Sequence, residues 1–213
     1  MLVGLLAQFT PPSLPARGAT VESLVPTGWT IEQRHQADFN RDGRADVLLL
    51  LRQAGTDGAA SRRIVLVALA AIRPQGYALF DSSARLIPSD SSGQLEDPLA
   101  NGEISARSGG FDVKLSMMSG AGSYVMATMR YRFRFERDCL RLIGFDRDET
   151  HRGTLDTKDL SVNFLTGGVT TTAGNAESNR TQPQRSRLAS NPRRCLSDVS
   201  NGWSFDPLAR EAR

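Results

Sequence analysis

Short apolar runs, separated by turn-forming residues, recur along most of this chain. Residues 46–51 and 62–69 are apolar on both faces, which is typical of strands buried on two sides. Residues 131–136 instead alternate apolar and polar side chains, with the period of a half-buried strand. We expect strands at residues 28–33, 46–52, 63–70, 76–82, 102–107, 111–118, 124–136, 139–146 and 159–172.

The spacing of these runs predicts an all-β fold. Turn signals such as Ser108-Gly-Gly110 and Arg137-Asp138 fall where hairpins would reverse the chain. We therefore expect a single antiparallel β domain, arranged as a sandwich or as a small propeller-like set of sheets. No repeat period is visible, which argues against a propeller of many blades. The run at 62–69 leaves a helix open as an alternative, because Ala68 to Ala71 favour one.

Both ends of the chain differ in composition from its middle. Residues 1–25 begin with an uncharged apolar stretch followed by prolines, which indicates a signal-peptide remnant or a disordered leader. Residues 26–172 hold the predicted strands and form the β domain. Residues 173–213 form a tail, which begins with a segment rich in Asn, Ser, Thr, Gln, Pro and Arg. Because few apolar groups there offset the entropy of ordering, we expect that segment to be flexible.

Charge and hydropathy exclude two classes of partner. The net charge is only +3, and the local excess of arginine at 175–194 has no interleaved aromatic residues for base stacking. A nucleic-acid ligand is therefore not expected. A membrane span is not expected either, because no run approaches the ~20 apolar residues that a spanning helix needs.

The nine residues from Asp38 to Asp46 suggest a calcium site. Oxygen-bearing side chains occupy positions 1, 3, 5 and 9, and Gly43 allows the chain to curl tightly around an ion. Calcium takes six to eight oxygen ligands, which short Asp and Asn side chains of one curled loop can provide. The predicted ligands are the side chains of Asp38, Asn40, Asp42 and Asp46 and the backbone carbonyl of Arg44.

This loop matches only the first half of an EF-hand. Position 12 is Leu49 instead of a bidentate Glu, and an apolar strand follows in place of a helix. The form is closer to the loop-then-strand calcium sites of integrin-type and propeller repeats. The alternative is a polar turn before a strand, since Asp, Asn and Gly favour turns without any metal.

Other chemical groups are sparse. Cys139 and Cys195 are compatible with one disulfide in an oxidising compartment, or with two buried thiols in a reducing cell. His35 and His151 are the only histidines, and neither lies at a metal-ligand spacing or beside a nucleophile motif. We therefore do not expect an enzyme, although carboxylates distant in sequence can still meet in space.

Residues 117–124 form the remaining unusual segment. Small residues precede Tyr124 between two predicted strands. Small residues allow a partner backbone to approach closely, and tyrosine is a stiff amphipathic anchor. The candidate partner-binding residues are Ser119, Gly120, Ser123 and Tyr124. The alternative is a hairpin loop whose tyrosine begins the next strand and packs locally.

An ordered series of motifs over about residues 28–170 resembles a family of bacterial envelope proteins. The series comprises Gly28-Trp29, the loop 38–46, Ile64-Val-Leu-Val67, Gly76-Tyr77, Asp97-Pro98, Ser119 to Ser123, Tyr131-Arg-Phe133-Arg-Phe135, Leu142-Ile-Gly144 and Asn163-Phe-Leu-Thr-Gly167. It resembles the calcium-loop periplasmic immunity proteins that protect Xanthomonas-type bacteria from secreted lysozyme-like effectors. Those proteins are in turn similar to invertebrate-type lysozyme inhibitors.

The resemblance implies a periplasmic protein that binds and blocks a lysozyme-like cell-wall hydrolase. Inhibitors of this kind insert a Ser/Gly–Tyr loop into the muramidase cleft, and the resemblance gives that role to residues 119–124. An inhibitor needs a rigid loop and no catalytic residues, and a bound calcium would add rigidity. The alternative function is a non-catalytic, calcium-stabilised envelope module for adhesion or interaction.

Overall fold

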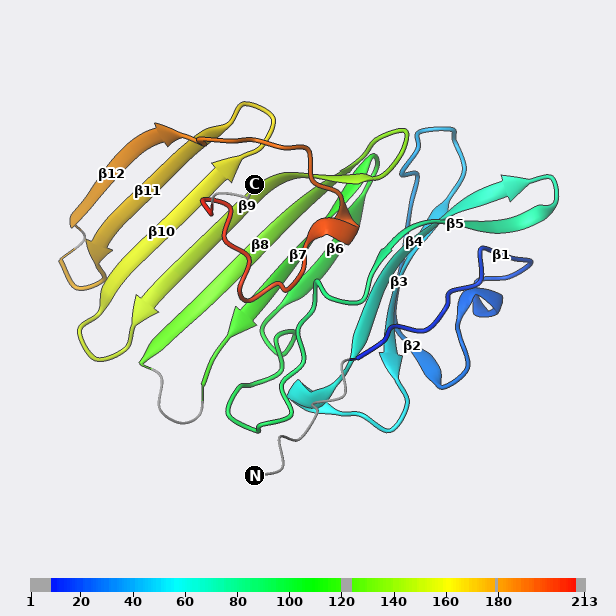
Figure 1. Ribbon diagram of the computed structural model, residues 1–213, viewed down its shortest axis with the longest axis horizontal. Coiled ribbons are helices and arrows are strands. Elements are labelled where there is room, and N and C mark those ends of the chain that lie inside the picture. The colour runs from blue at the N-terminus through cyan, green and yellow to red at the C-terminus, as the bar shows by residue number, and fades with distance from the viewer. Residues whose placement is uncertain (1–8, 120–123, 179, 210–213) are drawn as a thin grey trace, which may run out of the picture.

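Two antiparallel sheets make up the described part of the chain (Figure 1). A computed structural model describes residues 9–119, 124–178 and 180–209. The first sheet has the order β1-β5-β4-β3-β2, with β1 (Arg17–Gly18), β2 (Trp29–Ala37), β3 (Asp46–Gln53), β4 (Arg63–Ile72) and β5 (Gln75–Ser83). The second has the order β12-β11-β10-β9-β8-β7-β6, with β6 (Glu103–Arg107), β7 (Gly110–Met117), β8 (Val125–Phe135), β9 (Leu140–His151), β10 (Asp156–Asn163), β11 (Gly168–Asn175) and β12 (Arg180–Arg187).

The all-β prediction is confirmed. The helical elements among the described residues are three short 3-10 turns, η1 (Glu22–Leu24), η2 (Gly58–Ala60) and η3 (Leu196–Asp198). The run at 62–69, for which a helix was the alternative, lies almost entirely in strand β4. No helix in this part of the chain is long and apolar enough to cross a membrane.

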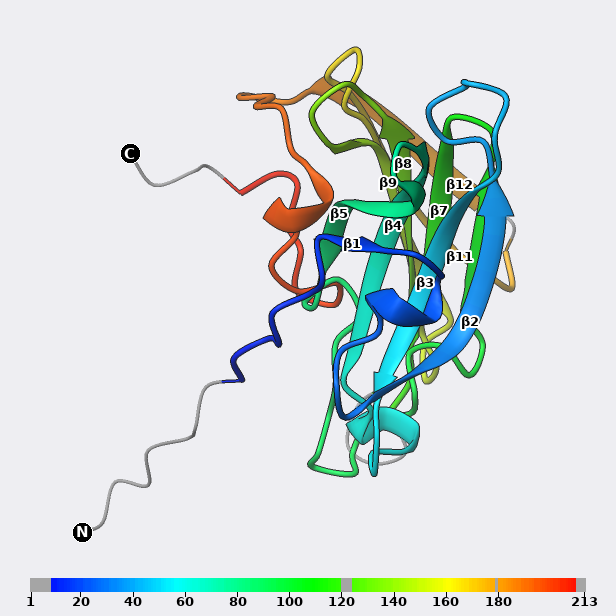
Figure 2. The ribbon, with the colours of Figure 1, turned by 90° about the vertical axis from the view of Figure 1, so that its right-hand side faces the viewer.

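Strands β3 and β4 are buried on both faces, as their continuous apolar sequences predict. One face carries Leu48 and Val65, which belong to a large core shared with the seven-stranded sheet. The opposite face carries Leu49 and Leu66 and is covered by the N-terminal segment. Figure 2 shows β1 and η1 lying over β3 on the side away from the seven-stranded sheet. The five-stranded sheet is thus the middle layer of the molecule.

Residues 9–25 are not a loose leader. Their two-residue strand β1 pairs with Tyr77 and Ala78 of β5, and their side chains Val21 and Leu24 are buried. Sequence reasoning missed this role because the apolar residues of the segment are few and follow no strand or helix period, and their partners lie far along the chain. Residues 1–8 lie outside the described part.

Two further predictions, on the strand at 159–172 and on the flexible segment after it, are wrong in the second half of the seven-stranded sheet. The predicted strand 159–172 is two strands, because the chain turns at 164–167, where Asn163 Oδ1 accepts hydrogen bonds from the amides of Leu165 and Thr166. The segment predicted to be flexible contains the end of β11 and the edge strand β12, paired along its whole length. An edge strand needs few apolar residues and tolerates Pro183, so composition alone did not reveal it.

The C-terminal tail returns to the seven-stranded sheet and crosses it (orange to red in Figure 1). Leu196 and Val199 are fully buried, and the Tyr131 hydroxyl donates a 2.6 Å hydrogen bond to the carbonyl of Gly202. Burial also raises the pKa of that tyrosine. Phe205 packs against the rings of Tyr131 and Phe145. The tail therefore completes the core of this sheet.

The single disulfide expected for an oxidising compartment is present. It joins Cys139, just before β9, to Cys195, just before η3, with Cα atoms 5.8 Å apart. Arg193 adds ion pairs to Glu136 and Asp138 beside it. The bridge fixes the tail where it first meets the sheet.

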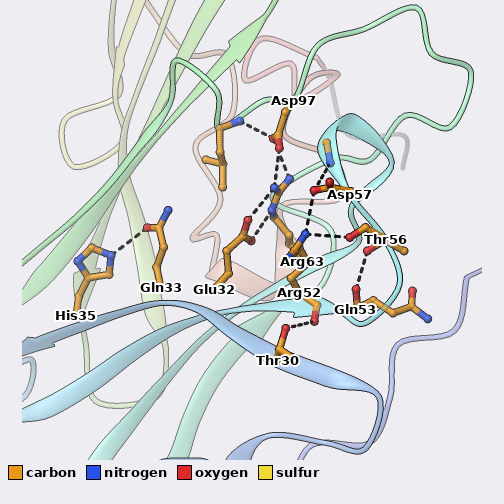
Figure 3. A network of polar contacts seen from close by, with 12 residues as sticks. Thr30, Glu32, Gln33, His35, Arg52, Gln53, Thr56, Asp57, Arg63 and Asp97 are labelled. Atoms are coloured by element: carbon orange, nitrogen blue, oxygen red, sulfur yellow. Dashed lines mark hydrogen bonds and ion pairs between the residues drawn. The ribbon is translucent and has the colours of Figure 1, made fainter.

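One buried arginine connects β2 and β4 to the turn at Asp97 (Figure 3). The Arg63 side chain is only 3% exposed and makes paired hydrogen bonds to two carboxylates. Its Nε and Nη2 donate to Glu32 at 2.7 and 3.0 Å, while Nη1 and Nη2 donate to Asp97 at 2.9 and 2.7 Å. Every guanidinium nitrogen is thus satisfied, which offsets the cost of removing this charge from water.

Candidate functional site

The loop 38–46 is curled as the calcium hypothesis requires. Both carboxylate oxygens of Asp38 accept backbone amide protons, from Asp42 at 3.0 Å and from Gly43 at 2.9 Å. Asn40 Oδ1 accepts from the amide of Asp42 at 3.1 Å. The curl needs left-handed backbone at Arg41 and Gly43, with φ of 61° and 84°. Acceptor oxygens of Asp38 and Asn40 therefore converge on the amide of Asp42.

Asp46, the last predicted ligand, links the loop to the neighbouring strand. It is fully buried, and its Oδ1 accepts from the amide of Ala70 at 2.8 Å. Its Oδ2 accepts from the amides of Phe39 at 2.9 Å and Asn40 at 3.4 Å. Burial raises the pKa of Asp46 in spite of these hydrogen bonds. The three amide donors offset only part of the cost of burying this charge, and a nearby cation would offset more of it.

The donor chemistry of the loop fits calcium. Three carboxylates and one amide oxygen supply hard oxygen ligands, and a carboxylate can accept more hydrogen bonds or metal contacts than these make. Arg44 and the Asn40 amide nitrogen both contact Asp42 Oδ2, so a cation at Asp42 would compete with those contacts. Among the described residues, no group of three or more His, Cys, Asp or Glu is arranged to hold a metal. The calcium site therefore stays a prediction.

The loop lies where the two sheets meet. Phe39 is fully buried in the shared core, and the Asp38 carbonyl accepts from Gly109 N at 3.1 Å and Ser108 Oγ at 3.2 Å. Gly109 has φ of 79°, and a Cβ there would lie 2.7 Å from Nη2 of Arg41. The β6–β7 turn thus packs closely against the loop, so a ligand that orders the loop should stabilise both sheets.

We expect calcium to raise the thermal unfolding temperature by several degrees relative to chelator. A ligand that binds only the folded state adds about 2.7 kcal/mol at a hundredfold excess over its Kd. Asp42→Ala should abolish the difference between melts in calcium and in chelator. The control is Asp57→Ala, which removes an exposed carboxylate outside the loop and should keep the difference. Superimposable melts of the wild type in the two buffers would contradict the calcium site.

The candidate partner-binding loop begins at a buried residue and ends at an exposed one. Ser119 is 6% exposed, pairs with Leu95 in an isolated bridge, and accepts a hydrogen bond from Arg152 at its carbonyl. It therefore anchors the loop and does not offer a surface to a partner. Gly120 and Ser123 lie outside the described residues. Tyr124 is 65% exposed, the highest exposure among the large hydrophobic side chains described.

Tyr124 is held in place although it is exposed. Its ring stacks on His151 with centroids 5.7 Å apart, and its carbonyl accepts from the amide of Arg152 at 2.6 Å. His151 is fixed in turn, because its Nδ1 accepts the amide proton of Thr154 at 3.1 Å. A neutral imidazole that accepts at Nδ1 carries its proton on Nε2. The site thus presents a fixed phenol with an imidazole donor beside it.

Sequence reasoning gave His151 no role and missed its contact with Tyr124. The two residues meet because β8 and β9 pair with Val125 directly opposite His151. That register depends on the long antiparallel hairpin of β8 and β9, whose turn at 136–139 is far along the chain from both Tyr124 and His151. The alternation of residues 131–136 identifies one strand of the hairpin and says nothing about its partner's register.

Thr154 and His151 are not arranged as a nucleophile and its general base. Thr154 Oγ1 lies 3.1 Å from His151 Nδ1, but it donates its proton to Asp156 Oδ2 at 2.6 Å. The imidazole nitrogen already accepts the Thr154 amide proton, so it is not placed to take a hydroxyl proton. The cluster orients a surface histidine.

Comparison with known proteins gives no match to a family model, a curated protein or a solved structure. The resemblance to periplasmic immunity proteins therefore rests on the ordered sequence motifs.

Proposed function

We propose that this protein is a periplasmic immunity protein or inhibitor that binds and blocks a lysozyme-like cell-wall hydrolase. The observation that carries the proposal is the exposed, fixed ring of Tyr124, which follows a run of small residues in the sequence. A tyrosine already held in its bound orientation loses little entropy on binding, which suits a hot spot. The Cys139–Cys195 disulfide supports an oxidising compartment such as the periplasm.

The chemistry of the target matches what this site offers. Muramidase clefts contain two carboxyl groups, one acting as acid and the other charged. The Tyr124 hydroxyl and the imidazole N–H of His151 are hydrogen-bond donors that can reach such groups once the loop enters the cleft. In this proposal, calcium at 38–46 stiffens the junction of the sheets, while Tyr124 makes the central contact.

The wild-type protein should inhibit lysis of purified cell walls by a lysozyme-like muramidase at a one-to-one molar ratio. The test is a turbidity assay over a panel of muramidases and amidases, including any hydrolase encoded beside this gene. Inhibition confined to muramidases would support the proposal. Absence of inhibition across the panel would contradict it and favour an envelope adhesion or interaction module.

A further inference from the structure

A trough crosses one face of the seven-stranded sheet beside the tail. It consists of two adjoining hollows of about 370 and 300 Å³, which share Glu149 and Lys158. These two residues are directly opposite each other on β9 and β10. The trough therefore runs across β9–β12 from His151 to Gln184, on the order of 15 Å at the usual spacing of strands.

We infer that this trough binds a linear, uncharged oligosaccharide. Its floor includes apolar surface from Leu160, Ala173 and Leu208, which suits the C–H faces of sugar rings. Its walls carry amide and hydroxyl groups from Gln182, Gln184, Thr154 and Thr171. Side-chain amides both donate and accept hydrogen bonds, as sugar hydroxyl and acetamido groups require.

The charges of the trough favour an uncharged ligand. Two cationic side chains, Arg147 and Lys158, lie beside two carboxylates, Glu149 and Asp156. Arg147 forms an ion pair with Glu149. The hydrogen bond from Thr154 is the main cause of the lowered pKa of Asp156, and the charge of Lys158 lowers it further. Because the charges compensate one another, neither a polyanion nor a polycation gains a net attraction.

An extended peptide is a poorer match for the same trough. Strands β9, β10 and β11 are paired on both sides, so their backbone groups are occupied within the sheet. The outer edge of β12 lies at one end of the trough, which crosses the strands and does not follow that edge. A peptide bound in extended form relies on backbone hydrogen bonds along a sheet edge. A saccharide recognised through side chains needs no such edge.

The inference does not use the Tyr124 ring, so it is separable from hydrolase inhibition. The probes are tetramers of β-1,4-linked N-acetylglucosamine and of β-1,4-linked glucose, titrated into the isotope-labelled protein. We expect amide shifts at residues 147–149, 158–160 and 171–173 and at Gln182 and Gln184. Gln184→Ala should raise the Kd by about threefold to tenfold, the loss expected for one or two hydrogen bonds. Tyr124→Ala should bind the tetramer as the wild type does.

The matched control is Arg185→Ala. Gln184 and Arg185 are neighbours on β12 but face opposite sides of the sheet, because they are opposite Thr171 and Thr170. Only the first should affect the saccharide. The inference is overturned if neither tetramer shifts the trough amides at millimolar concentration, or if the two variants have the same Kd. Binding of a short peptide at these amides in place of either tetramer would also overturn it.

Discussion

Replacing Arg63 with alanine should lower the free energy of unfolding by about 3–5 kcal/mol, as expected for one partner removed from a buried ion pair. The guanidinium is almost fully buried between Glu32 and Asp97. Alanine would leave two partly buried carboxylates close together without their shared cation. Their desolvation and mutual repulsion then oppose folding. Urea unfolding at neutral pH measures the effect.

Arg52 provides the matched control. It lies directly opposite Arg63 in the β3–β4 pair, but its ion pair is with Asp57, whose side chain is 96% exposed. Exposed pairs contribute about 1 kcal/mol or less, so Arg52→Ala should be nearly neutral. Equal losses of unfolding free energy in the two variants would mean that the stabilising effect of Arg63 does not come from burial of its ion pairs.

Loss of the Cys139–Cys195 disulfide should cost roughly 4 kcal/mol, the entropy expected for a closed loop of this length. The bridge spans 56 residues and includes β10, β11 and β12 in the loop that it closes. The variant Cys139→Ala/Cys195→Ala should therefore unfold at a much lower denaturant concentration than the oxidised wild type. Reductant should lower the wild-type midpoint toward that of the variant and leave the variant itself unchanged.

A wild-type midpoint that does not respond to complete reduction would contradict this prediction. Free-thiol titration during the same experiment shows whether reduction was complete. Because Leu196 and Val199 are buried beyond the bridge, the tail retains contacts of its own, and the variant should still fold.

Much of the fold could be predicted from local patterns. The apolar runs of β3 and β4 and the alternation in β8 each reflect the burial of that strand alone, so they can be read without knowing its neighbours. The tight curl at 38–46 is likewise local, because Asp, Asn and Gly determine it within nine residues.

The parts that could not be predicted depend on distant partners. β1 is two residues long and exists because β5 has an edge to pair with. β12 is polar and contains a proline, and its pairing with β11 makes it a strand. The same holds for the sites, since Arg63 meets Glu32 and Asp97 from 31 and 34 residues away. Sequence spacing contains no information on such contacts.

The most direct test of the central claim is the affinity of the inhibited hydrolase for the wild type and for Tyr124→Ala, measured by calorimetry. A fixed aromatic anchor at the centre of an interface predicts a loss of about 2 kcal/mol or more. Because the ring is exposed, the variant should keep the wild-type melting temperature. The exposed Leu165→Ala, at another turn of the same sheet, should bind as the wild type does. Equal affinity of the wild type and Tyr124→Ala would contradict the account.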